Sequence, residues 1–344
     1  MATTFKTFLS EDVTSTRTLL HENIPITGSM VSDLFYQDNN IKNFSHERFQ
    51  SVYDYPYLSS SANHIFDISF GISAESEVSG TTTGHIDIEK KSQMYNTMAQ
   101  MLAGYDTTGS ILRFDVDGDL SPASSDKHND CVFLTFSRLL VKDEIKKGSV
   151  NLVLGSGSYG ASIFDDLVTI ADYGAATEYR INSPAGEYGI LYSGSAATEG
   201  TGVGLVFYQA GVIVLTASLF GGDSNDFHNT TGRTDYLIGS SIQEISDVVR
   251  KRVQNINFNN TVELNSTIYF CRINHNEFNY SSNPTYLSES KIRVKEEKID
   301  EPISYITTVG LYSSNNELLA VAKLSEPLKK TPQNSLILRT RLDF

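Results

Sequence analysis

The chain has 344 residues, and its 27 Lys and Arg against 41 Asp and Glu give a formal net charge of −14. At roughly 150 residues per domain, this length predicts about two domains, with a core large enough to fold without disulfides or structural metal ions. The 40% hydrophobic content excludes a disordered chain. The excess of acid argues against a protein that wraps duplex nucleic acid, which needs clustered Lys and Arg.

The beginning of the chain is polar and rich in turns, so residues 1–63 are expected to form an extended N-terminal arm. Its first residues contain no basic segment followed by an apolar core, and no secretory signal is expected there. Tyr53, Tyr55 and Tyr57 alternate around Pro56, and such rings can anchor an arm on the surface of another protein. An irregular segment packed on its own domain is the alternative.

The middle of the chain, residues 64–255, is expected to form a central β-rich domain with two amphipathic helices, at 88–103 and 241–254. It opens with HIFDISFGIS, in which every second residue from Phe66 to Phe70 is apolar, as in a strand with one buried face. Later segments are short, apolar and β-branched, and polar turns separate them. This spacing predicts antiparallel sheets and not βαβ units.

The first predicted helix carries a stripe of methionines. Met94, Met98, Met101 and Leu102 are spaced to share one face, and Gly104 follows as a C-cap. A methionine stripe can be an adaptable binding face, but it is more often the side of a helix that packs on the core.

One uncharged stretch, Gly202 to Gly222, resembles a membrane span in length and composition. Gln209-Ala210-Gly211 interrupts it, and Val, Ile, Phe and Tyr dominate on both sides. Two buried strands joined by a tight turn are therefore predicted instead of a membrane helix.

The last part of the chain, residues 256–344, is expected to form a C-terminal β domain. Two strands flank the turn Ser313–Asn316 and predict a hairpin, and SLILRTRLDF alternates as a strand up to Phe344. The predicted fold class is thus α+β, predominantly antiparallel β with sandwich-like sheets, two amphipathic helices and the N-terminal arm.

The two cysteines, Cys131 and Cys271, each lie inside an apolar strand-like segment. They are expected to be free thiols in a reducing compartment. A single long-range disulfide between them is the alternative.

A glycine-rich segment, Gly155-Ser-Gly157-Ser-Tyr-Gly160, matches the dinucleotide-binding pattern and follows a strand. A dinucleotide site needs a helix after the glycines to hold the pyrophosphate. Residues 168–170 are instead β-branched, so a hairpin loop is predicted.

Two further motifs carry chemistry at first sight. Asp115-Val-Asp117-Gly118-Asp119 resembles a calcium loop, but its glycine is the fourth residue of the loop instead of the sixth, and the twelfth residue is Asp126, so the register of an EF-hand fails and an Asp-rich turn is predicted. An isolated surface cation site is the alternative. Gly222-Asp223-Ser224 resembles a hydrolase motif, but nothing orients nearby His228 as a base. No catalytic, cofactor-binding or metal-ligating residue is therefore assigned, and an enzyme is not expected.

Aromatic residues near the C-terminus are candidates for contacts with other proteins. Phe278, Tyr280 and Tyr286 lie among Asn and Ser in NEFNYSSNPTY, a composition that suits a contact loop. A loop held by its own rings is the alternative. A terminal strand that ends at Phe344 can pair with the sheet of a neighbouring chain.

Several segments distributed from the first residues to the last resemble virion structural proteins, of the tail and baseplate type, of T4-like contractile-tailed bacteriophages that infect marine bacteria, cyanobacteria included. The most specific are the segment from Asn274 to Leu287 and the hairpin from Tyr305 to Lys330. The segments that carry the resemblance are MATTFKTFLSEDVTSTRTLLHE, QSVYDYPYLSSSANHIFD, RLLVKDEIKKGSVNLVLG, SPAGEYGILY, GLVFYQAGVIVL, STIYFCRINHNEFNYSSNPTYL and YITTVGLYSSNNELLAVAKLSEPLKKT.

The resemblance implies a non-enzymatic component of the virion, most specifically of the tail baseplate, that is assembled in the host cytoplasm. Its implied partners are other tail, baseplate or neck proteins and copies of itself in a three- or six-fold assembly, with no nucleic acid, membrane or cofactor. Three alternatives stay open: a neck, head-completion or capsid-surface protein, a tail-fibre attachment protein, and a cell-wall hydrolase. The last would need an acid pair, for which Glu263 and Glu277 are the nearest candidates.

Overall fold

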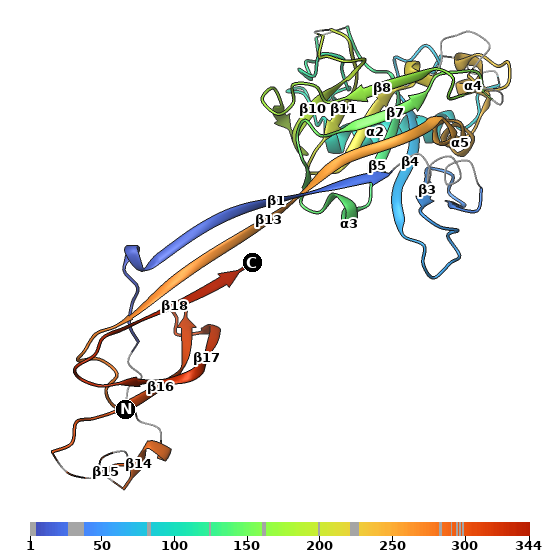
Figure 1. Cartoon of the computed structure of the whole chain (residues 1–344). Coiled ribbons are helices and arrows are strands. Elements are labelled where there is room, and N and C mark those ends of the chain that lie inside the picture. Colours follow the sequence, from blue (N-terminus) through green and yellow to red (C-terminus); the bar gives the residue numbers. More distant parts are fainter. Residues whose placement is uncertain are drawn as a thin grey trace. The chain divides into compact units, whose positions relative to one another are not determined.

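The computed structural model describes residues 5–26, 38–80, 84–123, 125–159, 163–198, 200–220, 227–281, 284–289, 291–293, 295, 297 and 299–344. The chain divides into two compact units. The central unit is Leu20–Val262, and the terminal unit combines Met1–Leu19 with Glu263–Phe344. The strands β1 (Val13–Ile26) and β13 (Val253–Ile273) each contain a boundary between the units (Figure 1).

The central unit is built on an antiparallel sheet with the strand order β13-β7-β8-β10-β11-β12-β5-β4-β3-β2, and β6 and β9 pair with β13 and β10. Each neighbouring pair in this order is antiparallel, which confirms the predicted β-rich α+β class. The strands are β2 (Ile41–Asn43), β3 (Gln50–Tyr53), β4 (His64–Ile72), β5 (Asp130–Phe136), β6 (Glu144–Ile145), β7 (Asn151–Gly155), β8 (Leu167–Ala171), β9 (Arg180–Ser183), β10 (Gly186–Ser193), β11 (Gly202–Phe207) and β12 (Val212–Thr216).

Both predicted helices are present. They are α2 (Ile88–Leu102) and α5 (Ile242–Arg252), and the shorter helices α3 (Arg138–Val141) and α4 (Arg233–Gly239) and the 3-10 turn η2 (Ala217–Phe220) accompany them. Ser241 and Glu244 form a capping box at the start of α5, which satisfies two backbone donors that the helix leaves free. The prediction that the methionines of α2 face the core is only partly correct, because Met94 is buried but Met101 is 55% exposed.

The sheet is covered on both faces, and the two helices lie on opposite sides of it. Alternation along β5 places Leu134 in one buried cluster with Ile245 of α5, and Phe133 in another with Tyr95 of α2. Gly71 on β4 permits the close approach of α2, because a Cβ there would lie 2.5 Å from the backbone nitrogen of Tyr95. The central unit therefore has two hydrophobic cores, one on each face of its sheet.

The uncharged stretch from Gly202 forms the hairpin β11–β12, as the turn signal predicts. Gly211 in the turn has φ +67°, a conformation that glycine adopts without strain. Among the described residues no helix is long and apolar enough to cross a membrane.

The terminal unit consists of strands with few turns of helix. The end of β13 pairs antiparallel with β18 (Leu336–Asp343), from Ser266 opposite Asp343 to Ile273 opposite Leu336. The predicted hairpin is present as β16 (Ser304–Tyr312) and β17 (Leu318–Lys330), a separate two-stranded sheet. The remaining elements are η1 (Ser10–Asp12), η3 (Pro284–Tyr286), β14 (Leu287–Ser288) and β15 (Lys291–Ile292).

The unit boundaries differ from the expected divisions at residues 63 and 255. Within the expected arm, β2 and β3 pair with each other, and β3 also pairs with β4 in the central sheet. The first nineteen residues cluster with the C-terminal strands instead. Composition marks the segment as polar, but it does not reveal which distant strands its backbone pairs with.

Candidate functional site

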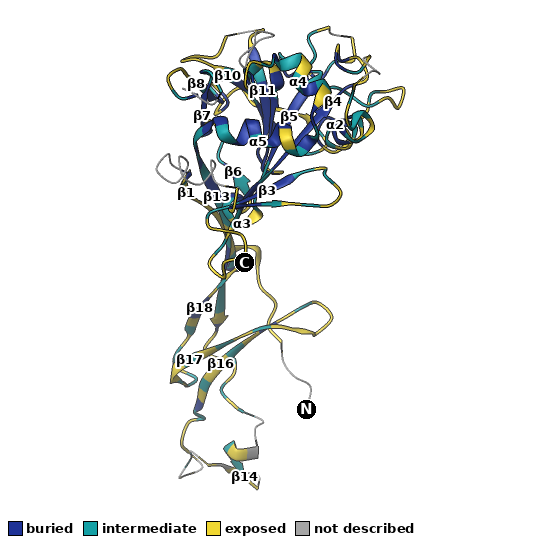
Figure 2. Ribbon diagram, turned by 90° about the vertical axis from the view of Figure 1, so that its right-hand side faces the viewer, coloured by how far each residue is buried: buried dark blue, intermediate teal, exposed yellow. Residues whose placement is uncertain are grey.

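The distribution of apolar side chains separates the two units. Of the 54 buried hydrophobic residues in the described ranges, 51 lie in the central unit, and Ile273, Leu311 and Leu338 lie in the terminal unit. Both hydrophobic core clusters also lie wholly in the central unit. Conversely, 15 of the 26 large hydrophobic residues that the structure describes as exposed belong to the terminal unit. Figure 2 shows this contrast, with buried residues concentrated in the central strands and exposed ones along β16, β17 and β18.

We define the terminal apolar surface by the most exposed members on the C-terminal strands. Val321 pairs with Gly310, and Tyr312 lies two residues beyond Gly310, so Tyr312 and Val321 share one face of the hairpin. In the described part of the chain, β16 and β17 pair with no other strand. The terminal apolar surface comprises Tyr312, Leu318, Leu319 and Val321 on the hairpin, which are 45–69% exposed; Tyr305, Ile337 and Phe344 are exposed elsewhere in the unit.

The predicted contact loop from Asn276 to Tyr286 is anchored by Lys330. The buried Lys330 ammonium donates hydrogen bonds to the carbonyls of His275 and Thr331 and to Asn279 Oδ1 at 2.7–3.0 Å. Desolvation lowers the pKa of Lys330, while the charge of Glu277 opposes this shift. The loop is therefore held to β17 by backbone and amide oxygens.

The aromatic residues predicted in this loop are only partly brought together. The rings of Tyr280 and Tyr286 meet edge to face at 6.1 Å, and burial raises the pKa of Tyr286. Phe278 is 42% exposed at φ +53°, and its carbonyl accepts a bond from the Ser304 hydroxyl. Phe344 is 74% exposed, although its backbone pairs with Asn265.

Sequence reasoning missed the aromatic residues at the start of the chain. Phe5 contacts Tyr312 at 4.9 Å between ring centroids, and Phe8 contacts Tyr269 at 5.4 Å. The two phenylalanines in the polar segment TFKTF are the signal that could have found them. The first residues thus form part of the same unit as the C-terminal strands.

The predicted tyrosines of the arm lie in the central unit, with Tyr53 at the end of β3 and Tyr55 and Tyr57 in the connection to β4. Tyr53 contacts the rings of Tyr57 and His64 at 6.3 and 5.5 Å, while Tyr55 is 54% exposed. Asp54 accepts two hydrogen bonds from Asn63 and closes this loop. The tyrosines therefore form a compact loop within the sheet connection.

The Asp-rich turn brings its three carboxylates together. Ligand atoms of Asp115, Asp117 and Asp119 lie within 4.8 Å of one another, and Asp115 is fully buried. Burial raises the pKa of Asp115 to about 6, while Lys127 acts in the opposite direction. The Lys127 ammonium donates to Asp115 Oδ2 at 2.8 Å and to the Ser121 carbonyl at 2.6 Å. A cation of the chain itself is thus the direct neighbour of the buried carboxylate.

The glycine-rich segment and the two cysteines lie where the sequence predicts, as far as the structure describes them. Gly155 ends β7, and the following segment returns as β8, so the glycine-rich segment is part of a hairpin connection; Gly160 lies outside the described residues. Gly222-Asp223-Ser224 also lies outside them. Cys131 is buried, Cys271 is half-buried, and both are free thiols.

The two acids considered for a hydrolase are both paired with cations. Glu263 binds Arg17, and Glu277 binds Lys6. Lys6 and the backbone of Asn274 lower the pKa of Glu277, which is opposite to the shift that a general acid requires.

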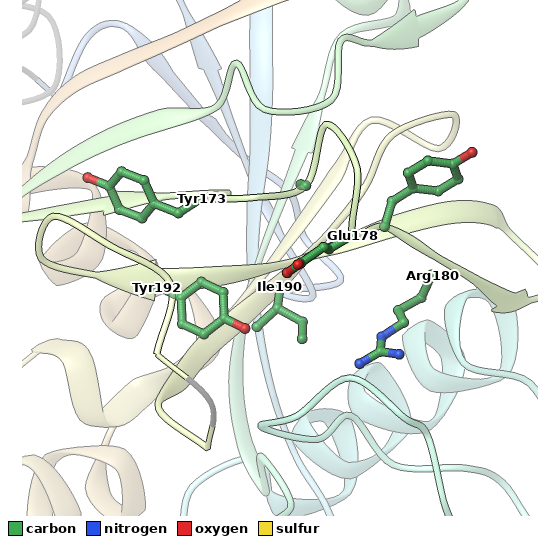
Figure 3. A pocket seen from close by; sticks show the side chains of 7 residues that line it. Tyr173, Glu178, Arg180, Ile190 and Tyr192 are labelled. Atoms are coloured by element: carbon green, nitrogen blue, oxygen red, sulfur yellow. The ribbon is translucent and has the colours of Figure 1, made fainter.

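A shallow hollow of about 270 Å³ lies in the central unit. Tyr173, Tyr192, Glu178 and Arg180 surround Ile190 there (Figure 3). The Tyr173 hydroxyl donates to the Gly194 carbonyl at 2.7 Å. The hollow offers one carboxylate, one guanidinium and half-buried tyrosine rings to a small polar group.

No family model, curated protein or solved structure matches this chain.

Proposed function

We propose that the protein is a structural component of a bacteriophage virion, in the tail baseplate, and that it acts by contacts with other proteins. The observation that carries this proposal is the terminal unit, whose apolar side chains are exposed instead of gathered in a core. An amphipathic strand is stable when its apolar face is covered by another layer. A partner that covers the terminal apolar surface supplies that layer.

The partners are other tail, baseplate or neck proteins and copies of the same chain, in an assembly of three- or six-fold symmetry. Assembly takes place in the host cytoplasm, where the free thiols of Cys131 and Cys271 stay reduced. The central unit suits this role, since its tyrosine loop at 53–57 is closed by the hydrogen bonds between Asp54 and Asn63 and presents the exposed Tyr55. The function is thus to join neighbouring proteins, with no chemical step.

Quantitative mass spectrometry of purified virions tests the proposal. Particles of the phage that encodes this sequence are separated into heads and tails, and the peptides of this chain are counted against a known tail protein. We expect the chain in the tail fraction at a copy number divisible by three or six. Its absence from mature particles would refute the proposal, and its presence in the head fraction would refute the tail position.

A further inference from the structure

The terminal unit combines an exposed apolar surface with a balanced set of charges. It holds 12 Lys and Arg and 12 Asp and Glu, so its net charge is zero. The central unit holds 15 Lys and Arg and 29 Asp and Glu and therefore carries the entire net charge of −14. Net charge far from zero keeps copies of a protein apart, whereas a neutral surface lets them associate.

From this partition we infer that the terminal apolar surface is covered by a second copy of this chain, and that the terminal unit makes the contact between copies. This inference rests on the proposed function and names the partner of that surface. Two copies that meet through their central units repel each other, because each of these units carries a net charge of −14. Terminal units meet without that repulsion, and each offers acids and bases in equal number to the other.

The missing core indicates a partner that is always present. The terminal unit comprises segments of 19 and 82 residues, and its described part contains three buried hydrophobic residues. A unit of this size normally buries a core of its own, and an isolated two-stranded hairpin such as β16–β17 is marginally stable in water. A second copy is made wherever the first one is, so it can complete the core without a separate supply.

The exposed area is large enough for such a contact. The seven exposed aromatic side chains in the described part of the terminal unit, each about half-exposed and of roughly 150–250 Å², alone present on the order of 700 Å² of surface. A standard interface uses about 800 Å² from each partner. The strand β18 adds a backbone edge, because in the described part of the chain it pairs with β13 alone. An edge strand of this kind can pair with a strand from another copy.

The mass of the purified full-length chain in solution, measured by light scattering during size-exclusion chromatography, tests the inference. We expect a multiple of the 38.0 kDa chain mass. The double variant Leu319→Glu, Val321→Glu should raise the dissociation constant at least about tenfold, because it places charge in a buried contact. Both side chains are exposed in a single copy, so circular dichroism should show an unchanged fold.

A matched control separates this surface from exposed apolar residues in general. Ile181 on β9 is 73% exposed, similar to Leu319 at 69%, but it lies in the central unit. Ile181→Glu should leave the mass unchanged. Leu318→Glu, at the position opposite Tyr312 in the same hairpin, supplies a second test of the same surface and should also weaken association, even if the double variant does not fold.

Two results would overturn the inference: a wild-type chain that remains at 38.0 kDa at concentrations up to about 100 μM, or equal dissociation by Ile181→Glu. The proposed function has a separate readout. A monomeric chain that is present in virions refutes self-association and keeps the virion role. An oligomeric chain that is absent from virions refutes the virion role and keeps self-association.

Discussion

Substitution of Tyr208 by Phe tests the hydrogen bonding of a buried carboxylate in the central unit. Tyr208 is fully buried and donates its hydroxyl to Asp172 Oδ2 at 2.9 Å. Asp172 is 2% exposed and also accepts from the backbone nitrogens of Gly148 and Val150, at 2.7 and 2.9 Å. The variant removes one of these three donors and keeps the aromatic ring.

The effect should depend on pH, because burial raises the pKa of Asp172 from 3.8 to about 6. The folded state thus binds a proton more readily than the unfolded state. The stability from this proton is fully present below about pH 4 and is lost as pH rises through 6. At pH 8 the carboxyl is a buried anion, and its three hydrogen bonds limit the cost of burial.

Removal of a hydrogen bond to a charged group costs about 1.5–3 kcal/mol, and to a neutral group about 1 kcal/mol. We therefore expect Tyr208→Phe to lower the free energy of unfolding by about 2 kcal/mol at pH 8 and about 1 kcal/mol at pH 5. The larger loss corresponds to a decrease of roughly 4–8 °C in the melting temperature.

Thermal and urea unfolding followed by circular dichroism at both pH values measures the difference. Tyr173→Phe is the matched control, because the exposed Tyr173 hydroxyl binds the neutral carbonyl of Gly194. That variant should change stability little, and equally at both pH values. If Tyr208→Phe destabilised the protein equally at pH 5 and pH 8, the reasoning about a charged hydrogen bond would be wrong.

Three further predictions concern the central unit. Gly71→Ala should lower the free energy of unfolding in urea by about 1–3 kcal/mol, because the added methyl group displaces α2. Gly80→Ala is the control and should change stability little, because a Cβ there meets nothing within 4 Å. Equal effects of the two variants would contradict the packing argument. Lys127→Met should cost about 3–5 kcal/mol at pH 8 and less below pH 6, where Asp115 takes up a proton, and Asp115→Asn in the same chain should recover part of the loss. Cys131 is fully buried and its pKa is raised, so a thiol reagent should label it only on unfolding, after the chain's other cysteine.

Much of the local structure follows from the sequence alone. The apolar period of 3.6 predicts α2 and α5, and the Ser241–Glu244 pair determines where α5 begins. Turn residues at 209–211 and 313–316 predict two hairpins that the structure contains. These features depend on interactions between residues close together in the chain, so the sequence itself gives their spacing.

Only the tertiary structure decided which segments share a unit and what covers their apolar faces. The alternation in β18 correctly places Leu338 and Thr340 on one buried face, but the same pattern leaves Phe344 exposed. The period of a strand tells which side chains point the same way, and it contains no information about the layer that packs against them. For this reason the sequence predicts the strands of the terminal unit, whereas its lack of a core emerges only when the whole chain is folded.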